Sequence, residues 1–413
     1  MLRIFPVLLL TPLISLGSVK CQLFDWRESM IECAKLESLS PNLIVRNLAI
    51  LSIGSFEILN LKEDKYQHYL SRSLSRPEKL DVASALRGYS LKITQSLHPL
   101  RSAKFRRLAH HHSIISGKVG HTPSFKFGEK LALLFLSLRS DDGATTRITY
   151  IPKTIPGHWR RTPHAMRPPE LPHWPMVAPF CLPSIESFLP PPPPDFDSPA
   201  YLEAVKEVKL FGGKNSPLRT KEQSEIAQFW KDFSYSSTPP GRWNEIAQQI
   251  SESRNLSPLE DARLFALLNA TLADAGIVAW ATKYKYQLWR PIHAIRLAAD
   301  FQSTQRLVGN NWEPLLETPP HPDYISGHGC YSGAAASVLQ FFFGSDKISF
   351  VVSASDPKKQ SRKFTSLQSC ASEIGKSRLW GGIHYQFSND QALLTGKKIA
   401  QYTCEKLFYP RQI

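Results

Sequence analysis

The sequence is short of cysteine, glycine and acidic residues. Six cysteines in 413 residues stand singly, at no spacing typical of a zinc module, and leave open only one or two disulfides in an oxidising compartment. Twenty-one glycines against 32 prolines exclude a collagen-like repeat. Thirty-five acidic against 50 basic side chains give a net charge of +15, which favours an anionic partner without naming it. There is no glycine-rich phosphate loop and no nucleic-acid-binding motif.

Long apolar runs are also missing, except near the first residue. Arg3, the apolar stretch 4–16 and the small residues that follow have the layout of a secretory signal peptide over residues 1–20. The alternative is a buried amino-terminal helix. No later run is long enough to cross a bilayer, so no transmembrane segment is expected. The sequence therefore predicts an exported protein, periplasmic or secreted.

Alternating strand patterns are absent, and apolar residues at helical spacing predict an all-α fold. Fifteen of the 32 prolines lie between residues 146 and 200, where proline blocks helices. Aromatic residues in this stretch predict that it wraps over the surface, anchored by its rings, at Trp159, Trp174, Phe180 and Phe188. We therefore expect a helical region at 21–145, a proline-rich wrapping segment at 146–200 and a helical domain at 201–413. Whether the helix near 40–59 packs within the chain or in a homodimer stays open.

Expected helices also cover further parts of the chain, namely 78–118, 125–139, 200–210, 219–235, 242–252, 257–285, 328–343, 362–375 and 388–407. Residues 302–326 have the composition of a loop.

Three short segments combine residues that suit an oxyanion. They read KYKYQLWRP at 283–291, YISGHG at 324–329 and SRLWGGIH at 377–384. Each segment alone is weak evidence of a functional site, because a lysine is usually solvated and a lone histidine is usually structural. Together they supply three cations, a serine and a glycine at a turn opening into a helix, and two histidines for acid–base or ligand roles. The residues are Lys283, Arg290, Ser326, Gly327, His328, Arg378 and His384.

In this order the segments resemble the signature shared by vanadium-dependent haloperoxidases and the type 2 phosphatidic acid phosphatase superfamily. That signature reads Lys, six residues, Arg-Pro; then Pro-Ser-Gly-His; then Ser-Arg, five residues, His. The first and third parts match fully, and the second departs at Ile325, which replaces proline. The likeness extends to ADAGI at 273–277, TPPHPDY at 318–324 and the stretch 188–201. It implies a helical bundle of the haloperoxidase and acid phosphatase type.

The resemblance also implies roles for the residues. His384 matches the sole protein ligand of vanadium, and His328 matches the acid–base histidine. Lys283 would polarise peroxide, with Trp280 and His321 as candidates for a halide pocket. The matching oxygen-binding residues are Lys283, Arg290, Ser326, Gly327 and Arg378. The implied cofactor is vanadate, and the partners are hydrogen peroxide, a halide and a small organic substrate.

Two alternatives remain. The same site suits an acid phosphatase, a phosphomonoesterase without vanadate, in which His384 would attack phosphorus and His328 would protonate the leaving group of a phosphate ester. In that branch an Asp orients the nucleophilic histidine, but Ser388 stands at its position and Asp390 comes two residues late, so what orients His384 stays open. The third alternative is a secreted, non-enzymatic protein that binds anionic polymers or cell-surface sugars, with the proline-rich segment as an interaction arm.

Overall fold

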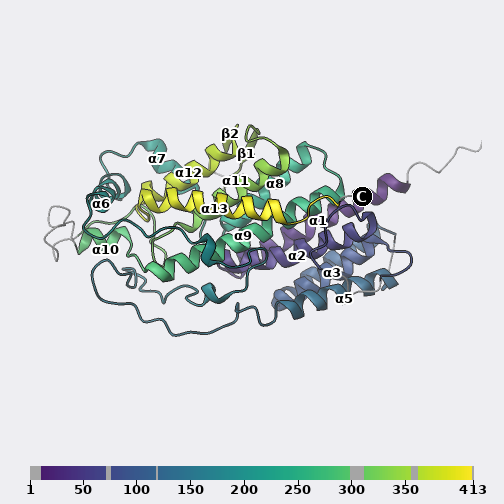
Figure 1. Ribbon diagram of the computed structural model, residues 1–413. Coiled ribbons are helices and arrows are strands. Elements are labelled where there is room, and N and C mark those ends of the chain that lie inside the picture. Colours follow the sequence, from purple (N-terminus) through teal and green to yellow (C-terminus); the bar gives the residue numbers. More distant parts are fainter. Residues whose placement is uncertain (1–10, 71–75, 118–119, 298–310, 355–360, 412–413) are drawn as a thin grey trace, which may run out of the picture. The chain divides into compact units, whose positions relative to one another are not determined.

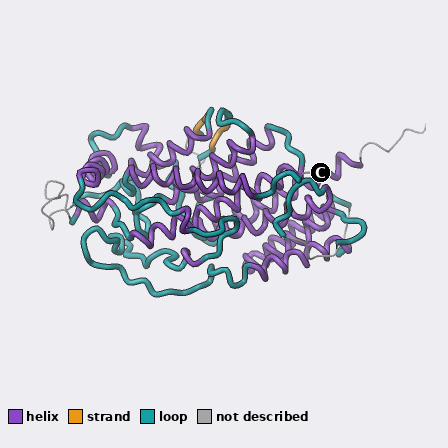
Figure 2. Tube along the Cα trace, viewed as in Figure 1, coloured by secondary structure: helices purple, strands orange, loops and turns teal. Residues whose placement is uncertain are grey.

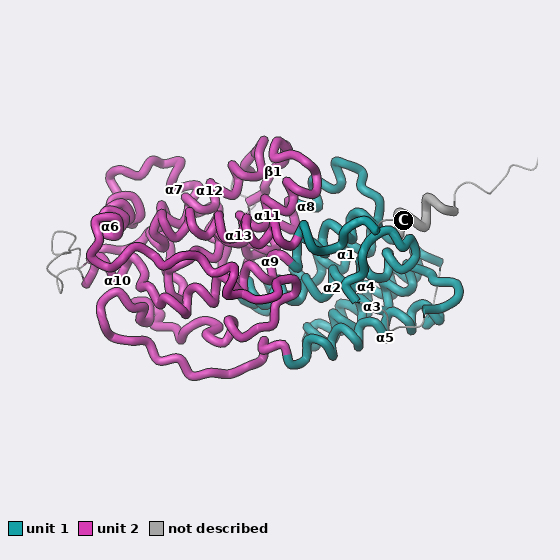
Figure 3. Tube along the Cα trace, in the orientation of Figure 1, with its two compact units in different colours: residues 1–141, 247–270, 404–413 teal, residues 142–246, 271–403 magenta. Residues whose placement is uncertain are grey.

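The computed structural model describes residues 11–70, 76–117, 120–297, 311–354 and 361–411 (Figure 1). The chain forms two compact units (Figure 3). Unit 1 comprises Met1–Asp141, Ala247–Ala270 and Cys404–Ile413, and unit 2 comprises Asp142–Ile246 and Thr271–Thr403. The expected proline-rich segment and most of the expected carboxy-terminal helical domain therefore fall in unit 2.

Unit 1 contains helices, namely α1 (Thr11–Leu36), α2 (Pro41–Glu63), α3 (Val82–Leu97), the 3-10 turn η1 (Pro99–Arg101), α4 (Ser102–Ile115) and α5 (Pro123–Leu138). Of these, α2, α3 and α5 begin after a residue whose side chain caps the first turn. Asp81 caps α3 by accepting from Ser84 N at 2.7 Å, and Thr122 caps α5 by accepting from Phe125 N at 3.1 Å. A Cβ at Gly88 would lie 2.1 Å from Phe125 O, so α3 and α5 pack backbone against backbone.

The predicted signal peptide overlaps the start of α1. Residues 1–10 lie outside the described residues, and α1 continues from Thr11 to Leu36 without a break. Within unit 1, Lys20 donates to Leu256 O at 3.0 Å and pairs with Asp261 at 3.1 Å. Export stays a prediction.

Two helices have the length and mean hydropathy of membrane-spanning helices. They are α2 and α9 (Pro258–Tyr286), with window values of 1.4 and 1.6. Within the protein, 89% and 100% of these windows are buried, as in the core helices of a folded domain.

The proline-rich stretch of unit 2 has no α-helix between Asp142 and Ser198 and only two 3-10 turns, η2 (Trp174–Met176) and η3 (Glu186–Phe188) (Figure 2). The predicted anchoring rings are all buried, which confirms that expectation: Trp159, Trp174, Phe180 and Phe188. A second anchor was not foreseen. The buried carboxylate of Asp274, on α9, accepts from three successive backbone N–H groups at 2.6, 2.8 and 3.0 Å, those of residues 180–182.

The rest of unit 2 is mainly helical, with one short two-stranded hairpin, so the prediction of a helical bundle is confirmed. Besides residues of α9, it contains α6 (Pro199–Gly212), α7 (Lys221–Phe229), part of α8 (Thr238–Ser253), α10 (Pro291–Arg296), α11 (Gly327–Phe343), α12 (Leu367–Trp380) and most of α13 (Gln386–Lys406). Helix α12 packs against α6, α7 and α11. These contacts place the ends of several helices within one unit.

Two local expectations were wrong. Residues 362–364 form a strand, β2 (Arg362–Phe364), which pairs antiparallel with β1 (Phe350–Val352), and α12 begins only at Leu367. Ser366 accepts from Ser369 N and so caps the helix there. Helix α7 ends at Phe229, before the predicted 235. The six cysteines, all among the described residues, are unbonded.

Candidate active site

The seven residues singled out in the sequence all belong to unit 2, and six of them stand at helix ends. Lys283 is in the last turn of α9, Arg290 precedes α10, and Arg378 is in the last turn of α12. Ser326 caps α11, Gly327 and His328 form its first turn, and His384 lies two residues before α13. All are buried except His328, which is half-buried.

Lys283 is held by the segment that precedes the Ser-Gly-His turn. Its Nζ donates to the carbonyls of Pro322 at 3.0 Å and Asp323 at 2.8 Å. Burial, with the charge of Arg290 second, lowers the pKa of Lys283 well below its ordinary value. An anion bound in the site would raise the pKa of Lys283 again and so favour its charged form.

Arg290 connects this segment to the last motif. Its Nε donates to His321 O at 2.8 Å, and its Nη2 lies 2.9 Å from His321 Nδ1. Its Nη1 donates to Ile383 O at 2.6 Å and lies 3.0 Å from His384 Nε2. Burial lowers the pKa of Arg290 to about 10, so the guanidinium remains charged at neutral pH. The planar fork thus fixes two histidines at once.

The first turn of α11 offers backbone donors. Ser326 Oγ accepts from Gly329 N at 3.3 Å, and Ser326 N donates to Ser388 O at 3.2 Å, which ties this turn to α13. The helix has 17 residues, so its amino end carries unpaired N–H groups and positive potential. A Cβ at Gly327 would lie 3.3 Å from Trp280 Cζ3, so this position has little room for a side chain.

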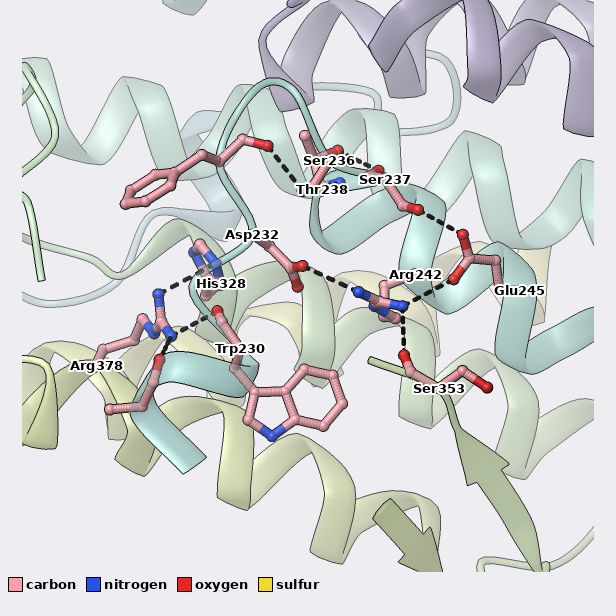
Figure 4. A network of polar contacts seen from close by, with 12 residues as sticks. Trp230, Asp232, Ser236, Ser237, Thr238, Arg242, Glu245, His328, Ser353 and Arg378 are labelled. Atoms are coloured by element: carbon pink, nitrogen blue, oxygen red, sulfur yellow. Dashed lines mark hydrogen bonds and ion pairs between the residues drawn. The ribbon is translucent and has the colours of Figure 1, made fainter. Parts of the chain in front are cut away.

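Arg378 lies beside His328 (Figure 4). Its Nη1 lies 3.4 Å from His328 Nε2, and its Nη2 donates to Trp230 O at 2.5 Å. The loop that follows Trp230 is fixed by a buried ion pair, in which Arg242 Nη2 lies 3.3 Å from Asp232 Oδ1. Arg242 also donates to Ser353 O at 2.9 Å. These contacts hold the loop 230–238 in place beside Arg378.

Two side chains lie beside Nδ1 of His384, those of Asp323 and Ser388. Asp323 Oδ2 lies 3.2 Å from His384 Nδ1, and Ser388 Oγ lies 3.5 Å from the same nitrogen. Burial raises the pKa of Asp323 to about 7, against the lowering effects of Arg290 and Lys283. The sequence pattern assigns no role to Asp323, because in the phosphatase pattern the orienting acid follows the histidine along the chain, whereas Asp323 precedes His384.

The two candidates for a halide pocket lie side by side. The ring centroids of Trp280 and His321 are 5.0 Å apart. A further residue, Glu170, holds Trp280: its backbone carbonyl accepts from Trp280 Nε1 at 3.2 Å and from Tyr284 OH at 2.6 Å. Burial raises the pKa of the Glu170 carboxyl. Glu170 comes from the proline-rich segment, and no sequence signal singled it out.

A glycine turn sets the spacing between Arg378 and His384. Gly382 has φ +73°, and a Cβ there would lie 2.3 Å from Gly212 O at the end of α6. Ile383 N donates to Arg378 O at 3.1 Å and closes the turn. The last motif therefore needs glycine at this position, for its left-handed φ and for the close approach of two backbones.

The balance of charge favours an anion. Burial and the surrounding cations lower the pKa of His321, His328 and His384, so these rings are neutral while Arg290 and Arg378 stay charged. The described residues contain no cluster of three or more His, Cys, Asp or Glu ligands. A metal held here would enter as an oxyanion bound by donors rather than as a cation in a ligand cage.

Comparison with known proteins gives a consistent result. Residues 263–411 match the family model of the VCPO second helical-bundle domain. The vanadium chloroperoxidase of Curvularia inaequalis is 26% identical over 264 residues, which cover 53% of this chain and 43% of that protein, so the chain spans less than half of that relative's length.

Two solved structures are similar over most of the chain. The first bacterial vanadium-dependent iodoperoxidase superposes with a TM-score of 0.84 at 26% identity, covering 95% of this chain and 98% of that one. A holo-type bacterial vanadium-dependent chloroperoxidase shares the fold, with a TM-score of 0.73 at 15% identity over 89% of this chain and 92% of that one. The part of the chain that carries the three motif segments therefore matches a haloperoxidase domain model, and the fold is similar to those of bacterial vanadium-dependent haloperoxidases.

Proposed function

We propose that this protein oxidises a halide with hydrogen peroxide at a vanadate bound through His384. One observation carries the proposal: His384 Nε2 faces Arg290 Nη1 at 3.0 Å while its Nδ1 faces Asp323 Oδ2 at 3.2 Å. When Nδ1 carries the proton, the lone pair of Nε2 points toward the cations, where a ligand bond to an oxyanion can form.

The donor set fits vanadate. Lys283, Arg290 and Arg378 supply positive charge to its oxygens, and the turn of Ser326 and Gly327 supplies neutral donors. Gly327 has no side chain that would fill this space. His384 would be the single protein ligand.

The residues of the chain then have distinct tasks. When bound, vanadate supplies a Lewis-acidic centre that activates peroxide. Lys283 and Arg290 hold negative charge in place, and His328, a neutral imidazole beside Arg378, takes up or returns a proton. Trp280 and His321 form the wall on which a halide would lie. The likeness to a bacterial iodoperoxidase supports iodide as the first halide to test.

A phosphomonoesterase is the second candidate, and a specific observation supports it. Asp323 gives His384 the carboxylate partner that a nucleophilic histidine needs. In the phosphatase pattern this acid follows the histidine along the chain, whereas Asp323 precedes it. His384 Nε2 would attack phosphorus, and His328 would protonate the leaving oxygen.

One assay separates the two. Purified protein is given orthovanadate, hydrogen peroxide and iodide or bromide with a halogen-accepting dye, and in parallel a chromogenic phosphate ester without vanadate. Vanadate-dependent halide oxidation that His384→Ala abolishes and the exposed control His164→Ala retains supports the first proposal. Ester hydrolysis that vanadate inhibits, without halide oxidation, replaces it with the second. Absence of both activities leaves an anion-binding protein.

Export through residues 1–20 is part of the proposal, supported by the signal-peptide layout of the sequence. Sequencing the amino terminus of protein recovered from the medium or periplasm tests it, and a full-length protein confined to the cytoplasm would contradict it.

A further inference from the structure

One surface stretch of unit 2 is basic and apolar at the same time. Between Gly143 and Pro169 the chain has no acidic residue. It carries five cations, Arg147, Lys153, Arg160, Arg161 and Arg167. Figure 2 shows this stretch within the long non-helical course between α5 and α6. We call residues 147–167 the basic strip.

The basic strip also exposes large apolar side chains. Ile151 is 80% exposed, Met166 53%, Ile155 50% and Ile148 43%. Single exposed aliphatic residues are common on protein surfaces, but four within 19 residues, set among cations, mark an interaction surface.

The strip is fixed in place, although it is neither helix nor sheet. Trp159 N donates to Gln287 O at 2.6 Å, and Trp289 N donates to Gly157 O at 2.9 Å. Thr162 Oγ1 donates to Thr318 O at 3.4 Å. These bonds attach residues 157–162 of the strip to the segments that carry Arg290 and His321.

Its cations are only partly neutralised. Arg167 pairs with Glu317 at 3.1 Å, and His164 lies 3.0 Å from Glu313. Arg160 donates to the carbonyls of Thr154 and Ile155. Among the described residues, no carboxylate forms an ion pair with Arg147, Lys153, Arg160 or Arg161.

We propose that the basic strip docks on the surface of an anionic phospholipid bilayer. Cations attract the headgroups, and the exposed isoleucines enter the boundary between headgroups and acyl chains. An acidic polysaccharide would engage the cations but leave the isoleucines in water, and an apolar protein partner would leave the cations unpaired. An anionic lipid surface engages both the cations and the isoleucines. This inference does not depend on the reaction at His384.

Sedimentation with lipid vesicles tests the proposal. The intact protein is mixed with vesicles of phosphatidylcholine, or of phosphatidylcholine with phosphatidylglycerol, at low and high salt. Binding is expected only to the anionic vesicles and is expected to weaken with salt. Each cation removed should weaken it about fivefold. The variants are Lys153→Glu with Arg161→Glu, and Ile151→Ser with Ile155→Ser.

The matched control is Lys130→Glu with Leu133→Ser, an exposed pair on α5 in unit 1. It should bind like the unmodified protein, and circular dichroism checks that all variants fold. Equal binding by both strip variants and the unmodified protein would overturn the proposal. So would binding to a soluble acidic polysaccharide that depends on the cations but not on the isoleucines, since that result identifies a polymer as the partner.

Discussion

The carboxylate of Asp323 lies 3.2 Å from Nδ1 of His384, with Ser388 Oγ 3.5 Å from the same nitrogen. The carboxylate and the ring come from different motif segments. The backbone carbonyl of Asp323 also accepts from Lys283 Nζ at 2.8 Å. One residue thus fixes both the lysine and the histidine of the site.

Asp323→Ala should weaken vanadate binding, because it removes the acceptor that orients His384 and leaves the carbonyl contact to Lys283. Loss of such a partner typically lowers affinity about 10- to 100-fold. Equilibrium dialysis against orthovanadate measures the change. The control is Asp390→Ala, which removes a carboxylate bound by Gln386. Equal affinities of the two variants would show that Asp323 does not position the ring.

Asp274→Ala should release the proline-rich segment from α9. Three backbone N–H groups at residues 180–182 would lose an ionised acceptor, at a cost of about 3 kcal/mol or more in the free energy of unfolding. Urea unfolding measures the loss, and limited proteolysis should cut near these residues first. The exposed Asp195→Ala, in the same segment, is the control. An unchanged cleavage pattern would contradict the anchoring role.

Arg242→Met should destabilise unit 2 by about 3–5 kcal/mol, because it leaves Asp232 buried without its cation (Figure 4). The double variant Asp232→Asn with Arg242→Met removes the stranded charge and should recover part of the loss. Urea unfolding of the single and double variants compares them. If both are equally destabilised, the cost comes from lost packing and not from the unpaired carboxylate.

The pH dependence of stability should include a contribution from His293. Burial and the charges of Arg160, Arg290 and Arg296 lower its pKa from 6.5 to about 4, while its Nε2 lies 3.2 Å from Arg161 O. The unfolded chain binds a proton near pH 6.5 but the folded chain does not. The stabilisation that comes from keeping His293 neutral is therefore fully present above pH 6.5. The free energy of unfolding then falls by about 3 kcal/mol as the pH drops toward 4.

Urea unfolding at a series of pH values measures this effect. His293→Gln can still donate to the Arg161 carbonyl but does not titrate, so its stability should fall less with acid. His164→Gln, an exposed histidine of the same segment, should follow the unmodified protein. Parallel profiles for the His293 variant and the unmodified protein would rule out the assignment.

The sequence predicted those features that depend on local pattern. The turn at Ser326 opens into a helix as predicted, and Ser326 caps that helix, α11, although Ile325 departs from the signature. Lys283 and Arg290 lie near helix ends, as their segment predicts. Contacts between distant segments could not be read in this way. Asp323 reaches His384, and Glu170 reaches Trp280, only after folding, and no spacing along the chain encodes either pair.

The backbone contact between Gly382 and Gly212 has a consequence for how this site can change over evolutionary time. The distance between the Arg378 guanidinium and the His384 ring is set there by main-chain atoms, which no substitution elsewhere in the turn alters directly. The side chains of Trp280 and His321, where we propose that a halide lies, can therefore be exchanged while the spacing between Arg378 and His384 is kept. The choice of halide and the binding of the anion would then vary separately.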